Sequence, residues 1–405
     1  MKELKISVIL LAFLLAAMVL VPMVSATINV NYSLVSDVST LPFPQLHFNT
    51  SQQYAKVTTE LDPDPNTQVA DVTNLLATSQ NPNISNIPYG SIIYHSKNGI
   101  TTVFDANGNQ LFAAKDANSP IIPTPSGSMP ATHIFGFPSG SAITTWGNIT
   151  YVSDSNVLLY KMIVEGSPTG STTSSPIPGL VDPHQYVEGI NATPTSSSLG
   201  DFSTYWTVPS NPQLSEETPI VGMIYLWNGI STIGNNPIIG TSELIQPVLQ
   251  WNVQTLPNQW SLASWMAWGN EFAGHTTNVT DVTTGDVIVG QMTYNPPTKT
   301  WTILARDTSK PGMPTATYTV EGSMPNSNVV TEVYLESYNT DDSTTYMPGP
   351  TPFYTFTMLD TNSKNCCPAS IMEDYQRSNF PGLTLNIANT QDWPNSISYP
   401  LIFST

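Results

Sequence analysis

Short runs of strand-forming residues recur along this chain, and turns of Asn, Gly, Pro and Asp separate them. Val, Ile, Thr, Tyr and Trp dominate the runs, and apolar and polar positions alternate within several of them, which is typical of an all-β sandwich or barrel. Nine antiparallel strands over about 200 residues fit one two-sheet sandwich. The nine predicted strands are Phe202–Val208, Ile220–Trp227, Leu244–Asn252, Ser261–Ala267, Asp286–Asn295, Thr300–Asp307, Ala316–Val320, Val329–Tyr338 and Phe353–Leu359.

Three further strands are predicted in the first half of the chain, at Ser91–His95, Thr101–Asp105 and Gln110–Lys115. Asn-Gly dipeptides connect them, and Asn-Gly is the preferred type I′ hairpin turn because both central residues need positive φ. The one helix that we expect beyond the N-terminal segment is the short stretch Ala369–Arg377. The predicted fold class is therefore all-β, with a smaller β-rich region before the sandwich.

The N-terminal end predicts a secretion signal. Met1–Lys5 carries two lysines, residues 6–24 are almost wholly apolar, and Val24-Ser25-Ala26 places small residues where a signal peptidase cleaves. An uncleaved membrane anchor is the alternative, and in both cases the rest of the chain is expected outside the cytoplasmic membrane, secreted or at the cell surface. The predicted divisions are a signal peptide (1–26), a small β-rich domain (27–165), a Gly/Ser/Thr/Pro linker (166–187) and the sandwich domain (188–405).

Two neighbouring predicted strands carry glutamines and tryptophans in otherwise apolar runs. Gln246 and Gln250 share a face, because successive side chains of a strand point to opposite sides, and by the same rule Trp265 and Trp268 point to opposite faces. Amides among indole rings suit a cleft that hydrogen-bonds a polar ligand and stacks on its flat surfaces. Trp251, Trp265 and Trp268 are therefore candidate ligand-binding residues, with filling of the hydrophobic core as an equal alternative.

Charge limits the possible partners. The chain has 11 basic and 29 acidic residues, a net charge of −18 and a pI of about 4.3. Nucleic acid is excluded because its phosphates need Lys and Arg, and a membrane contact is expected only if the N-terminal segment stays uncleaved. So acidic a chain suits low pH, since few buried ion pairs would be lost on protonation. Six glycosylation sequons occur, at Asn31, Asn49, Asn83, Asn148, Asn191 and Asn278.

Familiar catalytic and metal-binding motifs are missing from the sequence. It has no G-x-S-x-G, no H-E-x-x-H, no Gly-rich phosphate loop and no EF-hand pattern. The five histidines are scattered, and a turn position is the simplest interpretation of His275. The adjacent Cys366 and Cys367 lack a clustered His for zinc, so a vicinal disulfide, intermolecular pairing and a plain loop stay open. We accordingly expect no cofactor and no metal site.

Six short motifs follow one another in order over roughly residues 200–360. They are Trp206-Thr207-Val208-Pro209, Tyr225-Leu226-Trp227-Asn228-Gly229, Ile245-Gln246, the Trp-rich run, Thr284-Gly285-Asp286-Val287-Ile288 and Glu332-Val333-Tyr334-Leu335-Glu336. This ordered series resembles the eqolisin-type glutamic peptidases. The resemblance implies a concanavalin-A-like jelly roll of two bent antiparallel sheets, with the site in the concave face. It also implies a Gln/Glu dyad in which the carboxylate activates water and the amide helps to hold the oxyanion.

The sequence supplies only one half of this implied dyad. The glutamine of the family falls on Gln246 or Gln250, which are therefore candidate catalytic residues. The glutamate of the family lies in a Trp-x-Glu-Trp run, and Ala267 occupies the matching position here. Without a base, the attacking water loses its proton acceptor, which typically costs about 10²–10⁴-fold in rate. The candidate substitutes are Glu271, which we include among the catalytic candidates, and Glu332 or Glu336 on a later strand.

Three functions fit these observations. The first is a degenerate peptidase scaffold that binds peptide or carbohydrate in its concave cleft. The second is an active acid glutamic-type endopeptidase that uses a glutamine plus a relocated carboxylate, with the N-terminal region as a pro-segment. The third is a glycan hydrolase, which needs two carboxylates about 5–10 Å apart, and no E-x-D-x-E-type strand supplies them. Ala267 and the acidic N-terminal region favour the first function over the second.

Overall fold

The chain is built of strands. The computed structural model describes residues 90–96, 99–119, 121–146, 149–155, 157–164, 186–212, 222–233, 243–253, 256–268, 272–322, 324–338, 347–367, 372–375, 384–387 and 401–404, all in the compact unit Gln68–Thr405. Within these residues the regular elements are strands and two short 3₁₀ helices, which confirms the predicted all-β class. No helix in this described part is long and apolar enough to span a membrane. The predicted signal peptide, most of the predicted linker and Glu271 lie outside it.

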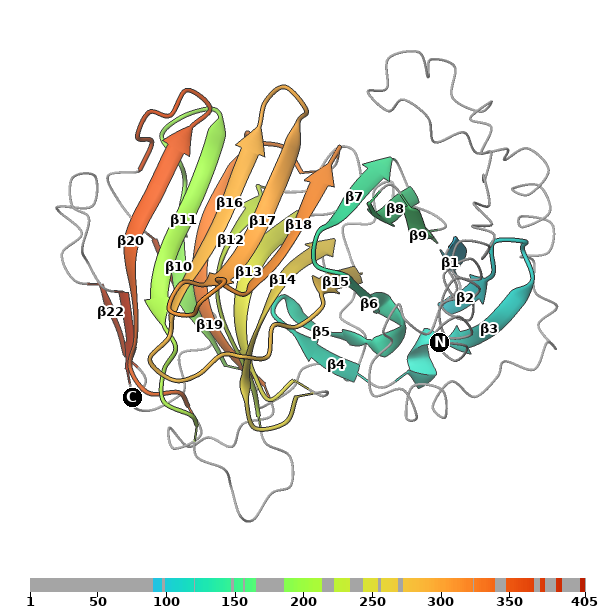
Figure 1. The fold of residues 1–405 in the computed structure, drawn as a ribbon, viewed down its shortest axis with the longest axis horizontal. Helices are drawn as coiled ribbons and strands as arrows, with labels where there is room; N and C mark the ends of the chain where they lie inside the picture. Colours follow the sequence, from blue (N-terminus) through green and yellow to red (C-terminus); the bar gives the residue numbers. More distant parts are fainter. Residues whose placement is uncertain are drawn as a thin grey trace, which may run out of the picture. The chain divides into compact units, whose positions relative to one another are not determined.

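Nine strands and both 3₁₀ helices come from the first half of the chain (Figure 1). The three strands predicted there are present. The elements are β1 (Ser91–His95), β2 (Ile100–Phe104), β3 (Gln110–Lys115), η3 (Asp116–Asn118), β4 (Ile121–Thr124), β5 (Gly127–Pro130), η4 (Ala131–His133), β6 (Ile134–Phe137), β7 (Ser141–Trp146), β8 (Ile149–Asp154) and β9 (Val157–Val164).

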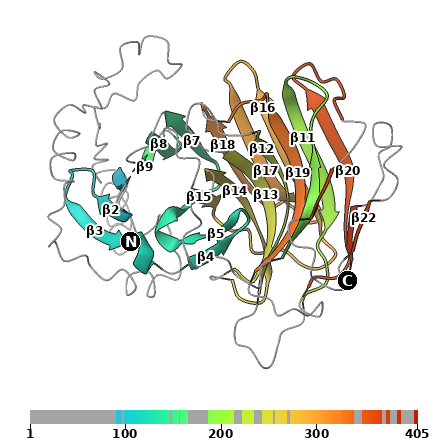
Figure 2. The ribbon, with the colours of Figure 1, turned by 180° about the vertical axis from the view of Figure 1, so that it is seen from behind.

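The second half of the chain supplies the strands of the sandwich, and each of the nine predicted strands has its counterpart (Figure 2). They are β10 (Tyr186–Ala192), β11 (Leu199–Thr207), β12 (Met223–Thr232), β13 (Glu243–Trp251), β14 (Trp260–Trp268), β15 (Phe272–Thr276), β16 (Val287–Asn295), β17 (Thr300–Asp307), β18 (Thr315–Glu321), β19 (Val329–Tyr338), β20 (Thr351–Asp360), β21 (Met372–Tyr375), β22 (Thr384–Ile387) and β23 (Leu401–Ser404).

The strands form two large sheets and one hairpin. One sheet has 13 strands in the order β22-β23-β20-β11-β16-β17-β18-β7-β8-β9-β1-β2-β3, and the other has eight in the order β21-β10-β19-β12-β13-β14-β15-β6. β4 and β5 pair only with each other. Strands from the first half extend both sheets, because β7 pairs with β18 and β6 pairs with β15. These two pairs and the β1–β9 pair are parallel, whereas the strands of the second half pair antiparallel.

The main hydrophobic core lies between the two sheets. Strand β17 buries every second residue, as expected of a strand with one face on a core and one in water. Side chains of both sheets meet in one cluster, with Leu249 and Met266 from the eight-stranded sheet and Ile288 and Ile303 from the other. This packing is a two-sheet β-sandwich, as the alternation in the sequence predicted.

The eight-stranded sheet is covered on its outer face as well. Every residue of β14 is buried, and so is nearly every residue of β13. Such burial requires a second layer over the outer face, because successive side chains point to opposite sides. The near-continuous apolar character of these two strands in the sequence has this physical cause.

One predicted element is wrong. The expected helix Ala369–Arg377 contains strand β21, which pairs antiparallel with β10. Short apolar runs do not distinguish strand from helix by periodicity alone, and here an available sheet edge decided the outcome.

Candidate functional site

On each strand of the eight-stranded sheet, residues that point into the core between the sheets alternate with residues that point to the outer face. Val248 of β13 and Trp265 of β14 belong to a second apolar cluster, whereas their chain neighbours Leu249 and Met266 belong to the core between the sheets. Gln246 and Gln250 are each two residues from Val248 and therefore share its face. The buried residues of this outer cluster are Met129, Ile134, Met223, Tyr225, Trp227, Val248, Val253, Ala263, Trp265, Ala273, Tyr334 and Tyr338.

The β4–β5 hairpin contributes to the covering layer. Its Met129 is 1% exposed within the outer cluster, and Ile122 packs against the same cluster. Gln246 Nε2 donates a hydrogen bond of 2.9 Å to the carbonyl oxygen of Pro125. Tyr225 donates its hydroxyl to the carbonyl oxygen of Pro123, also at 2.9 Å. The sheet face therefore holds the main chain of the hairpin through two side-chain donors.

Gln246 has spare hydrogen-bonding capacity in this arrangement. Its side chain is fully buried, and its Oε1 atom has no hydrogen-bond partner in the described part of the chain. Gln250 is bound differently, because its Nε2 donates to Asn278 Oδ1 and its Oε1 accepts from Trp265 Nε1, both at 2.9 Å. Of the two candidate glutamines, Gln246 is thus the one that contacts the main chain of the hairpin, at its turn residue Pro125, and Gln250 orients the indole of Trp265.

Glu336 of β19 lies on this face as a buried carboxyl. It is 5% exposed, and burial raises its pKa to about 8. Tyr338 donates its hydroxyl to Glu336 Oε2 at 2.7 Å, which offsets part of that effect. The backbone of Gly127 in the hairpin hydrogen-bonds in turn to Tyr338. With the hairpin in place, Glu336 is therefore a neutral acid at acidic and neutral pH.

Strand pairing sets the rows in which these groups lie. Tyr225 of β12 is directly opposite Gln250 on one side and Glu336 on the other. Glu332 lies four residues before Glu336 on β19 and therefore on the same face. It is opposite Gly229 and accepts a hydrogen bond of 2.6 Å from Ser231. Glu332 and Glu336, which the sequence offered as substitutes because they share a strand face, thus lie on the same outer face as the glutamines.

The other residues named from the sequence lie in two environments. Trp251 and Trp268 belong to the core between the sheets, where Trp251 packs on Trp260 with ring centroids 5.2 Å apart. Trp265 lies on the outer face and stacks on His275 at 4.5 Å. Ala267 is 2% exposed and pairs with Leu244 and Ala273, so apolar neighbours surround the position at which the resemblance expects a glutamate.

The structure also bears on the turn predicted at His275 and on the disulfide left open at Cys366 and Cys367. His275 lies in β15 and not in a turn, and burial lowers its pKa. Cys366 and Cys367 are both free, and Cys366 is buried. The vicinal disulfide that the sequence left open is absent at these two described residues.

No model of a known protein family matches the sequence, and no curated protein is similar to it. Solved structures resemble parts of it. Scytalido-glutamic peptidase with a peptide-based transition-state analogue has a TM-score of 0.36 and 13% identity, over 54% of this chain and 98% of that one. The eqolisin SCP-B, in complex with the tripeptide Ala-Ile-His, gives 0.35 and 11% over the same shares. A CBM2 module of a Lactobacillus casei BL23 phage J-1 protein gives 0.24 and 11%, over 38% and 70%. These similarities are distant and assign no activity.

Proposed function

We propose that the outer face of the eight-stranded sheet binds the main chain of a peptide, and that the β4–β5 hairpin occupies this face as an internal ligand. One observation carries the proposal: Gln246 and Tyr225 donate hydrogen bonds to the carbonyls of Pro125 and Pro123. Pro123 belongs to β4 and Pro125 to the turn that follows it, so two fixed side-chain donors hold main-chain carbonyls on either side of the strand end. The contacted groups are common to every peptide.

Peptide suits this face better than carbohydrate. Sugar platforms use exposed aromatic faces for stacking, but Trp251 and Trp268 lie in the core between the sheets. The indole of Trp265 is stacked by His275, and its N–H is bound to Gln250. The groups that remain directed at the hairpin are an amide and a phenol, which are ordinary donors for main-chain carbonyls.

A second candidate is an acid peptidase, and the carboxyl groups of β19 favour it. Glu332 and Glu336 share the face that carries Gln246, so an amide and a carboxyl group belong to one surface. While Glu336 is protonated it cannot act as the general base that takes a proton from the attacking water. Removal of the hairpin would admit solvent and lower the pKa of Glu336 towards that of an exposed glutamate. In this hypothesis the hairpin holds a peptidase inactive by occupying its site and by keeping the carboxyl neutral.

Loosening the hairpin tests the proposed function. Met129→Lys places a charge in the apolar contact between hairpin and sheet, where an unpaired charge is costly, and it leaves the sheet itself unchanged. Hydrogen exchange at residues 121–130 would first establish that the hairpin has loosened. A fluorescent decapeptide library should then bind Met129→Lys at least tenfold more tightly than wild type. Adding Gln246→Ala should reverse about tenfold of this gain, the loss expected for one hydrogen bond.

The matched control is Met313→Lys, which changes the same residue type at a position that is 51% exposed. Peptide binding by a folded Met129→Lys that does not exceed the binding by Met313→Lys would contradict the proposal. For the peptidase hypothesis, casein is digested at pH 2–5 and the products are analysed by mass spectrometry. Activity in Met129→Lys that disappears with Gln246→Ala and with Glu336→Gln supports it, and no activity, or activity unchanged by both substitutions, rejects it.

A further inference from the structure

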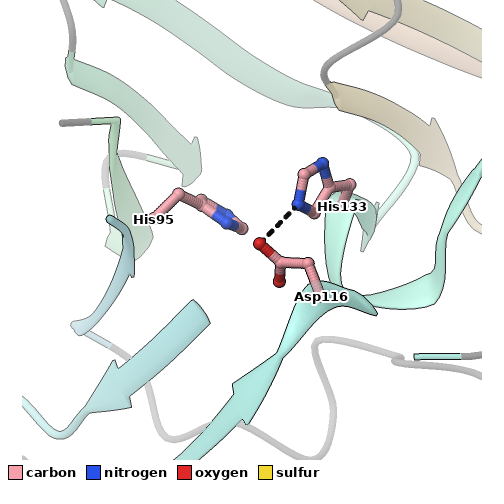
Figure 3. A group of neighbouring side chains, drawn as sticks. All are labelled: His95, Asp116 and His133. Carbon is pink, nitrogen blue, oxygen red and sulfur yellow. Dashed lines mark ion pairs between the residues drawn. The ribbon is translucent and has the colours of Figure 1, made fainter. Parts of the chain in front are cut away.

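Two histidines and an aspartate meet at the base of the β4–β5 hairpin (Figure 3). His95 ends β1, Asp116 begins η3 and His133 ends η4. One ligand atom from each residue lies within 4.8 Å of the other two, and His133 Nε2 is 3.1 Å from Asp116 Oδ2. His95 is 3% exposed, and the other two side chains are largely buried at 17% and 13% exposure. Phe272 closes the cluster by packing on both imidazoles.

A chain of hydrogen bonds fixes the tautomer of His95. Thr101 donates its single hydroxyl proton to Asp116 Oδ1 at 2.6 Å, because a carboxylate only accepts. The same hydroxyl oxygen is 2.7 Å from His95 Nδ1 and must accept there, so Nδ1 carries the proton. His95 Nε2 is then a bare lone pair, and it has no hydrogen-bond partner in the described part of the chain.

The carboxylate is oriented by the same network. Thr101 and Thr132 both donate to Asp116 Oδ1, at 2.6 and 2.9 Å. This leaves Oδ2 directed towards His133, and Figure 3 shows both imidazoles approaching this carboxylate. Groups that hydrogen-bond the ligands of a metal site from outside fix the tautomer and the ring orientation of its histidines, and the hydroxyls of Thr101 and Thr132 are placed to do this here.

We propose that His95 Nε2, His133 Nε2 and the Asp116 carboxylate bind one divalent transition-metal ion. Two imidazoles and one carboxylate suit Zn²⁺ and its neighbours, whereas Ca²⁺ and Mg²⁺ prefer oxygen ligands. Tetrahedral Zn²⁺ with bonds of about 2.0–2.1 Å holds its ligand atoms roughly 3.3 Å apart, so atoms that now lie within 4.8 Å of one another would have to approach by up to about 1.5 Å. The metal would take the lone pair of His95 and replace the direct contact of His133 with Asp116.

The position of the site gives the metal a structural consequence. Asp116 and His133 flank the segment that contains the β4–β5 hairpin, and His95 belongs to β1 of the 13-stranded sheet. One ion would therefore join the two ends of the hairpin segment to each other and to a sheet. Metal binding does not require peptide binding at the outer face, so the two proposals can fail separately.

The test uses the full chain with Cys366→Ser and Cys367→Ser, because adjacent thiols would compete for zinc. After removal of metal with EDTA, calorimetric titration with Zn²⁺ should show one tight site per chain. His95→Gln, His133→Gln and Asp116→Asn should each weaken it at least 100-fold. Thr101→Val keeps the β-branched shape and removes only the hydroxyl, and a second-layer substitution of this kind should cost about 10–100-fold.

The control is Asp281→Asn, which removes an exposed carboxylate whose side chain is 78% exposed, and it should bind Zn²⁺ like wild type. No site in the wild type, or one that survives all three ligand substitutions, would overturn the proposal. If a ligand variant does not fold, Co²⁺ added to the protein with Cys366→Ser and Cys367→Ser, and with all three ligands intact, decides. Visible d–d bands of a nitrogen–oxygen tetrahedral site support the proposal, and the spectrum of aqueous Co²⁺ rejects it.

Discussion

Gln246 of β13 donates its side-chain amide to the backbone carbonyl of Pro125, 121 residues earlier in the chain, at 2.9 Å. This bond joins the outer face of the sandwich to the loop of the β4–β5 hairpin, and the bond from Tyr225 to Pro123 accompanies it. A sheet face that holds a main chain in this way is occupied, so the peptide binding that we propose for it requires the hairpin to move away.

Gln246→Ala should destabilise the protein by about 1–3 kcal/mol, because it leaves the buried carbonyl of Pro125 without its donor. The loss should be concentrated in the hairpin, whose amides should exchange faster with deuterium than those of β16 and β17. Urea unfolding and hydrogen exchange measure the two effects. Unchanged stability together with unchanged exchange at residues 121–130 would show that the bond contributes nothing.

Glu336 should make the protein more stable in acid than in weak base. Its pKa is raised by burial from 4.5 to about 8, so the folded state keeps a proton that the unfolded state releases. The free energy of unfolding should therefore fall as the pH rises from about 4.5 to about 8, by about 5 kcal/mol at most. Glu336→Gln, which stays neutral, should flatten this dependence. Exposed Asp281→Asn should not, and an equally steep profile in Glu336→Gln would contradict the assignment.

Trp251 should matter for stability and not for ligand binding. It is 1% exposed in the core between the sheets, so Trp251→Ala should cost about 3–5 kcal/mol, the usual range for removing a buried large aromatic side chain. Trp251→Ala is then combined with Met129→Lys and measured at low temperature, where part of the protein stays folded. This folded protein should bind peptide with the same affinity as Met129→Lys alone. A selective loss of affinity at normal stability would place Trp251 at the ligand instead.

Cys366 and Cys367 should behave as unreactive thiols. Burial raises the pKa of Cys366 to about 11 and also raises the pKa of Cys367, so both are thiols and not thiolates at pH 7. A thiol reagent such as DTNB should therefore label native protein slowly and should label two thiols per chain at once in urea. If no thiol reacts in urea until a reductant is added, the two cysteines form a disulfide and the prediction is wrong.

Much of the sandwich was predictable because its strands are long and patterned. Strand Thr300–Asp307 was predicted with its exact bounds, and its burial alternates residue by residue. Strands β4, β5 and β6 were missed because Pro123, Gly127 and Gly136 weaken the strand signal of such short runs. Strands β7, β8 and β9 were also missed, although their runs are rich in β-branched and aromatic residues. Ala369–Arg377 was mistaken for a helix because the sheet edge that pairs with β21 is not visible in the sequence.

The candidate site was predictable only in part. Alternation placed Gln246 and Gln250 on one face, and no local pattern indicated that Pro123 and Pro125 would cover it. Each hydrogen bond joins residues more than 100 positions apart. His95, Asp116 and His133 escaped the motif search for the same reason, because 17 to 21 residues separate them along the chain and strand pairing brings them together.

The binding of the hairpin's own sequence in trans tests the central claim most directly. A labelled peptide of residues 121–130 (IIPTPSGSMP) is titrated into wild type, Met129→Lys and Met129→Lys with Gln246→Ala. We predict saturable binding to Met129→Lys, about tenfold weaker binding to the double variant, and no binding to wild type, whose face is occupied. A scrambled peptide with the same affinity, or equal binding to all three proteins, would contradict the account.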